Sequence, residues 1–207
     1  MINDFGFIIP QNCQFGVGAL KKLPEFLRSA GSSKVMLVSD RMLEKIGVVE
    51  KVRKILVEGN IEYAEYLDVV GNPTTDIVME CAELYKAEKC NGLLAIGGGS
   101  PMDVAKSVGV VTKFGGEIGD YEGVGKVPGK IDTLICVPTT AGTGSESTRH
   151  AVIYYNGIKQ SISHPSIRPD VAVLEPSLLD TLPDYQRKCA MLDALCQAVE
   201  SWWSMRA

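Results

Sequence analysis

The sequence has 207 residues, which is enough for one large domain or for one domain and part of another. Hydrophobic residues make up 45% of it and charged residues 22%, so the chain can fill a core and is not expected to be disordered. The net charge of −4 disfavours nucleic acid and anionic membranes as partners. We find neither a secretory leader nor an apolar run of about 18 residues, so no membrane-spanning segment is expected.

Apolar runs alternate with amphipathic segments along most of the chain. In chain order we expect a hairpin at Phe5–Phe15, a helix at Gly18–Ser29, a strand at Lys34–Ser39, a helix at Val48–Glu58, a strand at Ile61–Leu67, a turn at Asn72–Thr74, a helix at Thr75–Lys89, a strand at Gly92–Ile96, a helix at Pro101–Val111, a strand at Thr133–Val137, a β-hairpin made of Ala151–Tyr155 and Ile158–Ser163, a strand at Asp170–Leu174 and a helix at Pro183–Trp203.

Short apolar strands separated by helices are typical of a parallel sheet that is covered on both faces. Right-handed crossovers then make this an α/β fold with a doubly wound, Rossmann-like parallel sheet. The Asn156-Gly157 pair indicates the added β-hairpin, and one helix trails at the C-terminus. The ligand crevice of such a sheet lies beyond the carboxyl ends of its strands, where the motifs below fall.

The six cysteines form no CxxC pair, and several lie within apolar strand or helix patterns. We therefore expect reduced, mostly buried thiols in a cytoplasmic protein. The cysteines are Cys13, Cys81, Cys90, Cys136, Cys189 and Cys196.

A glycine-rich turn, Gly97-Gly-Gly-Ser100, follows one of the buried strands. Glycines let the backbone approach a bulky anion, and the helix that begins here offers free N–H groups to a phosphate. A plain strand-to-helix turn is the alternative, since a glycine loop alone is weak evidence.

Asp40 ends the first buried strand. A carboxylate at this place can accept hydrogen bonds from a ribose diol and repels a 2′-phosphate, which favours NAD over NADP. A helix N-cap is an equally good interpretation.

The loop Pro138-Thr-Thr-Ala-Gly-Thr-Gly-Ser-Glu146 gives the most specific signal. It follows a buried strand and places short hydroxyl donors and two glycines where a nicotinamide ribose and a pyrophosphate could be held. A polar surface loop would not be expected at the end of a buried strand.

Four motifs, in this order and spacing, resemble the iron-containing (group III) alcohol dehydrogenase family. They are Gly97-Gly-Gly-Ser-Pro-Met-Asp-Val-Ala-Lys106, the Pro138–Glu146 loop, Pro169-Asp-Val-Ala-Val-Leu-Glu-Pro176 and Leu192-Asp-Ala-Leu195. The resemblance implies an NAD-dependent, metal-containing alcohol dehydrogenase. It further implies that 1–180 is the dinucleotide-binding domain and that 181–207 begins an all-helical metal-binding and catalytic domain.

The resemblance also implies cofactor-binding roles. Asp40 would bind the adenosine ribose, and Lys159 would reach the nicotinamide ribose unless it is only a solvated hairpin lysine. The full cofactor-binding set is Asp40, Asn72, Gly97, Gly98, Gly99, Ser100, Asp103, Thr139, Thr140, Thr143, Ser145, Lys159 and Leu178. No residue is assigned as catalytic.

The metal site is where the sequence departs from the family pattern. The family holds iron or zinc with one Asp and three His, the first two of them four residues apart on one helix. Asp193 matches the Asp, but Gln197 stands where the family usually has His. An amide oxygen is a weaker donor than imidazole, so we expect a tight site for the divalent metal only in a complete two-domain protein.

Two histidines remain, His150 and His164. They either have no role or, together with Arg149, help to hold an anionic or polar substrate.

The expected function is that of an oxidoreductase that transfers hydride between NAD(H) and a small alcohol or aldehyde. We expect a truncated chain, because the Trp202–Trp203 pair would need a partner surface that the chain does not supply. A homodimer is also expected. One alternative is an NAD-binding fragment without turnover, and another is a lyase of the dehydroquinate-synthase type. The Pro138–Glu146 loop, called the threonine-rich loop below, favours the alcohol dehydrogenase branch.

Overall fold

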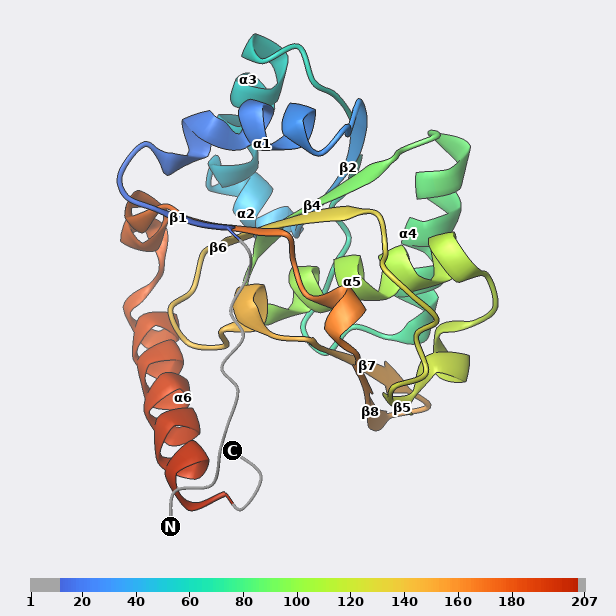
Figure 1. Cartoon of the computed structure of the whole chain (residues 1–207). Helices are drawn as coiled ribbons and strands as arrows, with labels where there is room; N and C mark the ends of the chain where they lie inside the picture. Colours follow the sequence, from blue (N-terminus) through green and yellow to red (C-terminus); the bar gives the residue numbers. More distant parts are fainter. Residues whose placement is uncertain (1–11, 205–207) are drawn as a thin grey trace.

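A computed structural model describes residues 12–204 of the chain, and a six-stranded parallel sheet forms its centre (Figure 1). Strands that are far apart in sequence lie side by side, as expected when helices make the crossovers. In spatial order the strands are β1 (Asn12–Phe15), β9 (Val171–Leu174), β6 (Thr133–Pro138), β4 (Gly92–Gly97), β2 (Lys34–Val38) and β3 (Glu62–Tyr66).

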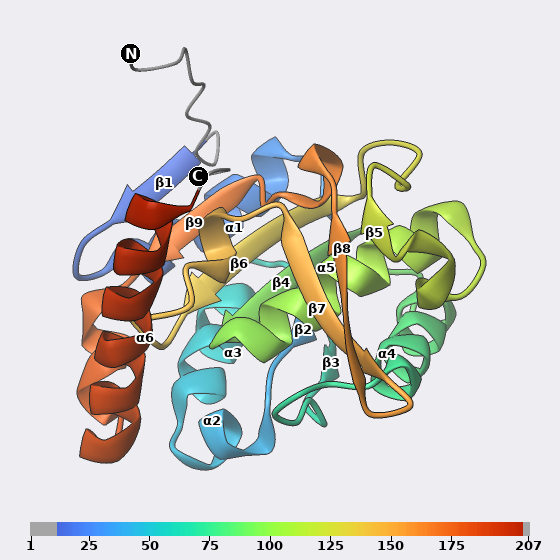
Figure 2. The same ribbon diagram turned by 90° about the horizontal axis from the view of Figure 1, so that it is seen from below.

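Helices cover both faces of this sheet, which confirms the predicted doubly wound fold (Figures 1 and 2). One face carries α1 (Leu23–Ser29), α2 (Arg41–Lys45) and α3 (Val48–Glu58). The other carries α4 (Thr75–Ala87) and α5 (Gly99–Phe114).

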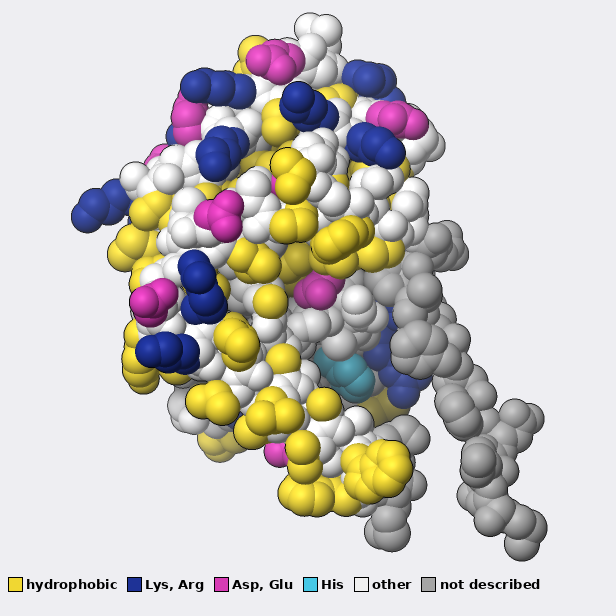
Figure 3. Space-filling model, turned by 90° about the vertical axis from the view of Figure 1, so that its left-hand side faces the viewer, with side chains coloured by type: hydrophobic (Ala, Val, Ile, Leu, Met, Phe, Trp, Pro, Cys, Tyr) yellow, Lys and Arg dark blue, Asp and Glu magenta, His cyan; other side chains and the backbone are white. Residues whose placement is uncertain are grey.

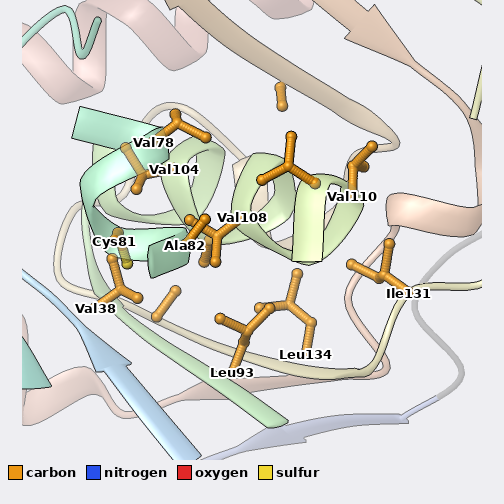
Figure 4. Packing of buried hydrophobic residues seen from close by; sticks show 14 of the residues in the cluster. Val38, Val78, Cys81, Ala82, Leu93, Val104, Val108, Val110, Ile131 and Leu134 are labelled. Carbon is orange, nitrogen blue, oxygen red and sulfur yellow. The ribbon is translucent and has the colours of Figure 1, made fainter. Parts of the chain in front are cut away.

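Neighbouring residues of one strand point to opposite faces, so each strand feeds two hydrophobic cores. Leu93 packs in the core beneath α4 and α5, whereas Leu94 belongs to the core beneath α1 and α3. Figure 4 shows part of the first core, in which Val104 of α5 lies beside Val78 of α4 and Val108 lies toward Leu93 of the sheet. A strand that is buried on both sides explains the continuous apolar runs in the sequence.

The predicted β-hairpin is present and belongs to a second, smaller sheet. Its strands β7 (His150–Tyr155) and β8 (Ile158–Ser163) pair antiparallel, and Asn156 and Gly157 take φ angles of 49° and 75° at the turn. Such angles suit a two-residue hairpin turn. A short strand, β5 (Gly123–Val124), pairs parallel to β8 and was not expected.

The last helix, α6 (Asp184–Trp203), lies along one end of the molecule and has no buried residue (Figure 1). Figure 3 faces this end and shows many hydrophobic side chains on it. Among the residues described, no helix is long and apolar enough to cross a bilayer. Short 3₁₀ turns complete the fold: η1 (Ala19–Lys22), η2 (Ile118–Tyr121), η3 (Ser145–Ser147), η4 (Pro165–Ile167) and η5 (Pro176–Thr181).

Two expectations need comment. Residues 1–11 of the expected N-terminal hairpin lie outside the described residues, and Asn12–Phe15 forms a strand parallel to β9. The six thiols are free, but "mostly buried" holds for only half of them, because Cys13, Cys189 and Cys196 are exposed. Two of these exposed thiols lie on α6, whose amphipathic pattern looks like that of a core helix.

Candidate functional site

A cavity of about 410 Å³ lies beyond the carboxyl end of β4, where α5 begins. The turn at Asn72 and Pro73, the loop after β6, the β7–β8 hairpin and α6 form its other walls, so five separate stretches of the chain meet there. It brings together most of the residues predicted from the sequence. The predicted residues that line it are Asn72, Gly99, Ser100, Asp103, Thr143, Ser145, Lys159, Asp193 and Gln197.

The glycine turn gives this cavity the open start of a long helix. Gly98 is the N-cap of α5, and no side chain caps the helix, so the first N–H groups of α5 stay available to a ligand. A Cβ on Gly97 would lie 2.7 Å from Pro101 Cγ, and one on Gly99 would lie 3.3 Å from Thr143 Cγ2. Glycine is therefore needed for the close packing of this turn, and the helix start suits an anionic group.

The threonine-rich loop is tied to the glycine turn and to α6. The Thr139 N–H donates to Gly97 O over 2.9 Å, which joins the ends of β4 and β6. A Cβ on Gly142 would lie 2.6 Å from Ala190 O, so the loop and the α6 backbone can approach only because this residue is glycine. The loop thereby brings α6 to the rim of the cavity.

Asn72 and Lys159 reach the cavity from two neighbouring segments. Asn72 takes a φ of 56°, a left-handed conformation that Asn tolerates in turns. The Tyr154 N–H donates to Pro73 O over 2.8 Å and fastens this turn to the hairpin that carries Lys159. This bond holds the turn with Asn72 beside β7, which pairs with the strand β8 that carries Lys159.

Asp103 is a mostly buried carboxylate that lines the cavity, with 16% of its side chain exposed. The Ser145 hydroxyl donates to Asp103 Oδ1 over 2.9 Å. Burial raises the pKa of Asp103, and the charge of Lys106 and the Ser145 hydrogen bond oppose that rise. A desolvated carboxylate that opens on a cavity is a good acceptor for hydroxyl groups of a ligand.

Six predicted residues do not line this cavity. Asp40 caps α2, with Oδ1 accepting from Leu43 N over 2.8 Å, and Leu178 is buried in the core beneath α1 and α3. Gly97, Gly98 and Thr139 support the glycine turn. Thr140 lines a second, apolar cavity of about 410 Å³ together with Pro138, Ala141, Leu174 and Leu179. The cofactor roles of these six residues, like those of the residues that line the cavity, stay predictions.

The two candidate metal ligands contact each other. Gln197 Nε2 donates to Asp193 Oδ2 over 3.0 Å, and both side chains line the cavity. Within residues 12–204, no group of three or more His, Cys, Asp and Glu could hold a metal ion. One carboxylate and one amide do not fit an iron or zinc site, which normally needs at least three protein ligands.

The structure gives different surroundings to His150 and His164, for which the sequence left the role open. His150 lines the cavity, and burial together with Arg149 and Lys106 lowers its pKa. His164 instead accepts a hydrogen bond from Ser166 N over 3.1 Å and caps η4.

Several lining residues were missed by sequence reasoning: Pro73, Thr148, Val152 and Tyr154. They lie beside predicted residues, but no local pattern distinguishes them. Lys106 lies in one of the four motifs and has no role predicted from the sequence, although a lysine in a largely apolar helical stretch is a signal of its own.

The chain matches the family described as "Iron-containing alcohol dehydrogenase" over residues 10–176. The chain belongs to the iron-containing alcohol dehydrogenase family. It is 40% identical to a choline dehydrogenase of Bacillus subtilis (strain 168), over 95% of this chain and 50% of that protein. It is 35% identical to an NAD-dependent methanol dehydrogenase of Bacillus methanolicus, over 95% of this chain and 52% of that protein.

A crystal structure of 1,3-propanediol oxidoreductase has the same fold, with a TM-score of 0.95 and 31% sequence identity. The match covers 99% of this chain and 54% of that one. The chain thus spans about half the length of the curated relatives that it matches. The family match confirms the resemblance that the four sequence motifs predicted.

Proposed function

We propose that this chain is the NAD(H)-binding part of an alcohol dehydrogenase that interconverts small alcohols and aldehydes. One observation carries the proposal. A single cavity gathers the uncapped start of α5, the threonine-rich loop and the hairpin lysine Lys159. The family membership and the NAD-dependent relative support the same cofactor.

In the proposed complex, the pyrophosphate binds at the start of α5. Gly98, Gly99 and Ser100 supply N–H donors there, and the positive end of the helix attracts the anion. Thr143 lies across from Gly99 and adds a hydroxyl donor. Asp103 and Lys159, on the same wall, are placed to contact ribose hydroxyls, an acceptor and a donor respectively.

When bound, the nicotinamide supplies the hydride chemistry, and the protein orients it. Asp40 would bind the adenosine ribose and disfavour a 2′-phosphate, so we propose NAD as the cofactor ahead of NADP.

Asp193 and Gln197 alone do not form a fitting metal site, so the proposal includes no step through a metal ion. A homodimer in the cytoplasm, acting on a small alcohol or aldehyde, completes the proposal.

Titration with NADH tests the cofactor assignment. We expect enhanced NADH fluorescence and a melting temperature raised by roughly 5–10 °C at about 100 times Kd. The variant G99V should lose both effects, because its side chain would collide with Thr143. Gly119→Ala is the matched control, since nothing lies within 4 Å of its added Cβ. If the unaltered chain neither changes NADH fluorescence nor melts later with NADH, the assignment is wrong.

A second candidate is an NAD-binding chain without turnover. Gln197, which stands where the family usually has a histidine ligand and donates to Asp193, favours it. Assays with NADH, added Fe²⁺ or Zn²⁺ and a panel of short aldehydes separate the two candidates. Robust NADH oxidation by the 207-residue chain would exclude the second candidate. NADH binding without oxidation would favour it.

A further inference from the structure

Lys106 is a fully buried lysine on α5, and the proposed cofactor contacts do not use it. Its side chain is 0% exposed, and it lies one helical turn after Asp103. An unpaired ammonium at such a depth would be strongly destabilising, so its surroundings must compensate for lost water.

Four oxygen atoms surround the Lys106 ammonium. Nζ lies 2.7 Å from Ser145 O, 2.9 Å from Ser145 Oγ, 3.1 Å from Thr148 Oγ1 and 2.7 Å from His150 O. Asp103 Oδ1 is slightly farther away, at 3.9 Å. The lysine thereby links α5 to the segment that leads from the threonine-rich loop into β7.

This set of partners determines the direction of the hydrogen bonds. An ammonium has three hydrogens and no acceptor, whereas a neutral amine would have only two hydrogens for the two carbonyls and two hydroxyls. We therefore take Lys106 as charged, although burial lowers its pKa. Ser145 Oγ must then accept from Lys106, and its own hydrogen is directed to Asp103.

The proton of the Ser145 hydroxyl decides what Asp103 offers to a ligand. With Oδ1 occupied by Ser145, an ionised Asp103 presents only acceptor positions to the cavity. Without the ammonium, Ser145 could point elsewhere, and burial would favour the neutral carboxyl, which is a donor.

We propose that Lys106 is a positioning residue that orients the Ser145 hydroxyl and keeps Asp103 an ionised hydrogen-bond acceptor for a ligand hydroxyl in the cavity. A ribose diol has the required donors, and this identification of the ligand rests on the proposed function. The proposed arrangement of Lys106, Ser145 and Asp103 itself does not depend on a ligand.

Other charged and titratable groups face this network and must be separated from Asp103. Lys159 of β8 acts on Asp103, while Cys136 of β6 and Glu146 of η3 act on Lys106. His150 of β7 has its pKa lowered partly by Lys106, and Asp193 of α6 lines the same cavity. Because removal of Lys106 also affects His150, a comparison in an Asp103→Asn background is required.

The test measures melting temperatures without ligand at pH 5 and pH 8 for wild type, K106M, D103N and the double variant. Burial raises the folded-state pKa of Asp103, so its contribution to stability falls as pH rises from the unfolded pKa to the folded one. K106M raises that folded pKa further. Its penalty should therefore be greater at pH 8 than at pH 5, by roughly 3 °C per unit of pKa.

This extra penalty of K106M at pH 8 should disappear in the D103N background. Any pH dependence that remains in the double variant comes from His150 or from Lys106 itself. An equal pH dependence in both backgrounds would overturn the proposal. If K106M does not fold, S145A decides the matter. S145A removes the hydroxyl donor to Asp103, so its melting penalty should also be greater at pH 8 than at pH 5, by less than the difference expected for K106M. A penalty for S145A that does not change with pH would equally overturn the proposal.

NADH titration separates this inference from the proposed function. At pH 6 we expect K106M to bind NADH at least about tenfold more weakly than wild type, with partial recovery at pH 8.5 as Asp103 ionises. An unchanged pH profile of binding in K106M would contradict the role of Lys106. Failure of the wild type to bind NADH would remove the proposed function instead, and the ligand-free melting data would still decide the role of Lys106.

Discussion

Asp40 combines two interpretations that the sequence could not separate. Its Oδ1 accepts from Leu43 N over 2.8 Å, so it is the N-cap of α2. The cap uses one oxygen of a half-buried carboxylate at the end of a sheet strand, which leaves the other oxygen for a ribose hydroxyl. Capping and cofactor selection are therefore compatible in one side chain.

Two substitutions at Asp40 separate these roles. Asp40→Ser keeps a capping oxygen and should melt within about 1–2 °C of wild type, whereas Asp40→Ala should lose about 1 kcal/mol, or roughly 2–4 °C. Both remove the charge that would repel a 2′-phosphate, so both should bind NADPH at least roughly tenfold more tightly. Melting curves and paired NADH and NADPH titrations check this. An unchanged preference in Asp40→Ser would reduce Asp40 to a helix cap.

Arg41 and Asp68 lie next to this position and form an ion pair of 2.8 Å between Nε and Oδ1. Hydrogen bonding to Arg41 lowers the pKa of Asp68. Both side chains are largely exposed, so the pair contributes little to stability. Any disturbance of this pair in the Asp40 variants would therefore change their melting temperatures little.

At the scale of elements, the contact between the threonine-rich loop and α6 depends on one glycine. The Cβ of Gly142→Ala would lie 2.6 Å from Ala190 O, a backbone atom that cannot rotate away. Because α6 has no buried residue, we expect α6 to move while the sheet stays folded. The cavity would then lose the wall that carries Asp193 and Gln197.

Limited trypsin digestion measures this movement. Gly142→Ala should be cleaved several-fold faster at Arg187 or Lys188, at a melting temperature within about 3 °C of wild type. Gly119→Ala, whose added Cβ meets nothing within 4 Å, should be cleaved at the wild-type rate. Equal cleavage of both variants would show that α6 does not depend on this contact.

Sequence reasoning found the elements whose signals are local. The apolar runs of the central strands, the glycine turn at Gly97 and the Asn156-Gly157 hairpin follow from short patterns, and each is present. The two-residue strand β5 and the hydrogen bonds of Lys106 depend on segments that meet only in the folded chain. No local pattern reports such contacts. The same reason explains why His150 and His164 could not be told apart.

At the scale of the whole molecule, α5 and α6 show the limit of periodicity. Both carry apolar residues at helical spacing. Packed beneath the sheet, α5 buries residues around most of its circumference, whereas α6 buries none and exposes Met191, Leu195 and Val199. A pattern identifies an apolar stripe, but the surface that the stripe packs against is decided elsewhere in the chain.

This difference predicts unequal costs for the same substitution on the two sides of the molecule. Leu93 is fully buried, and its Cδ1 lies 3.1 Å from the position of a Cβ on Gly109 of α5, so it fills the space that this glycine leaves. Leu93→Ala should cost about 2–5 kcal/mol through lost burial and a cavity. Leu195→Ala, at a position that is 59% exposed, should stay within about 0.5 kcal/mol.

Urea unfolding midpoints, with unchanged m values, measure both costs. A Leu195→Ala penalty as great as that of Leu93→Ala would show that the α6 face is covered in solution, because only a buried leucine loses that much. If a second copy of the chain packs on this face, the Leu195→Ala penalty should depend on protein concentration, because such an assembly dissociates when it unfolds. Light scattering across the same concentration range would detect that copy directly. A small penalty at every concentration is the result that the exposed face of α6 predicts.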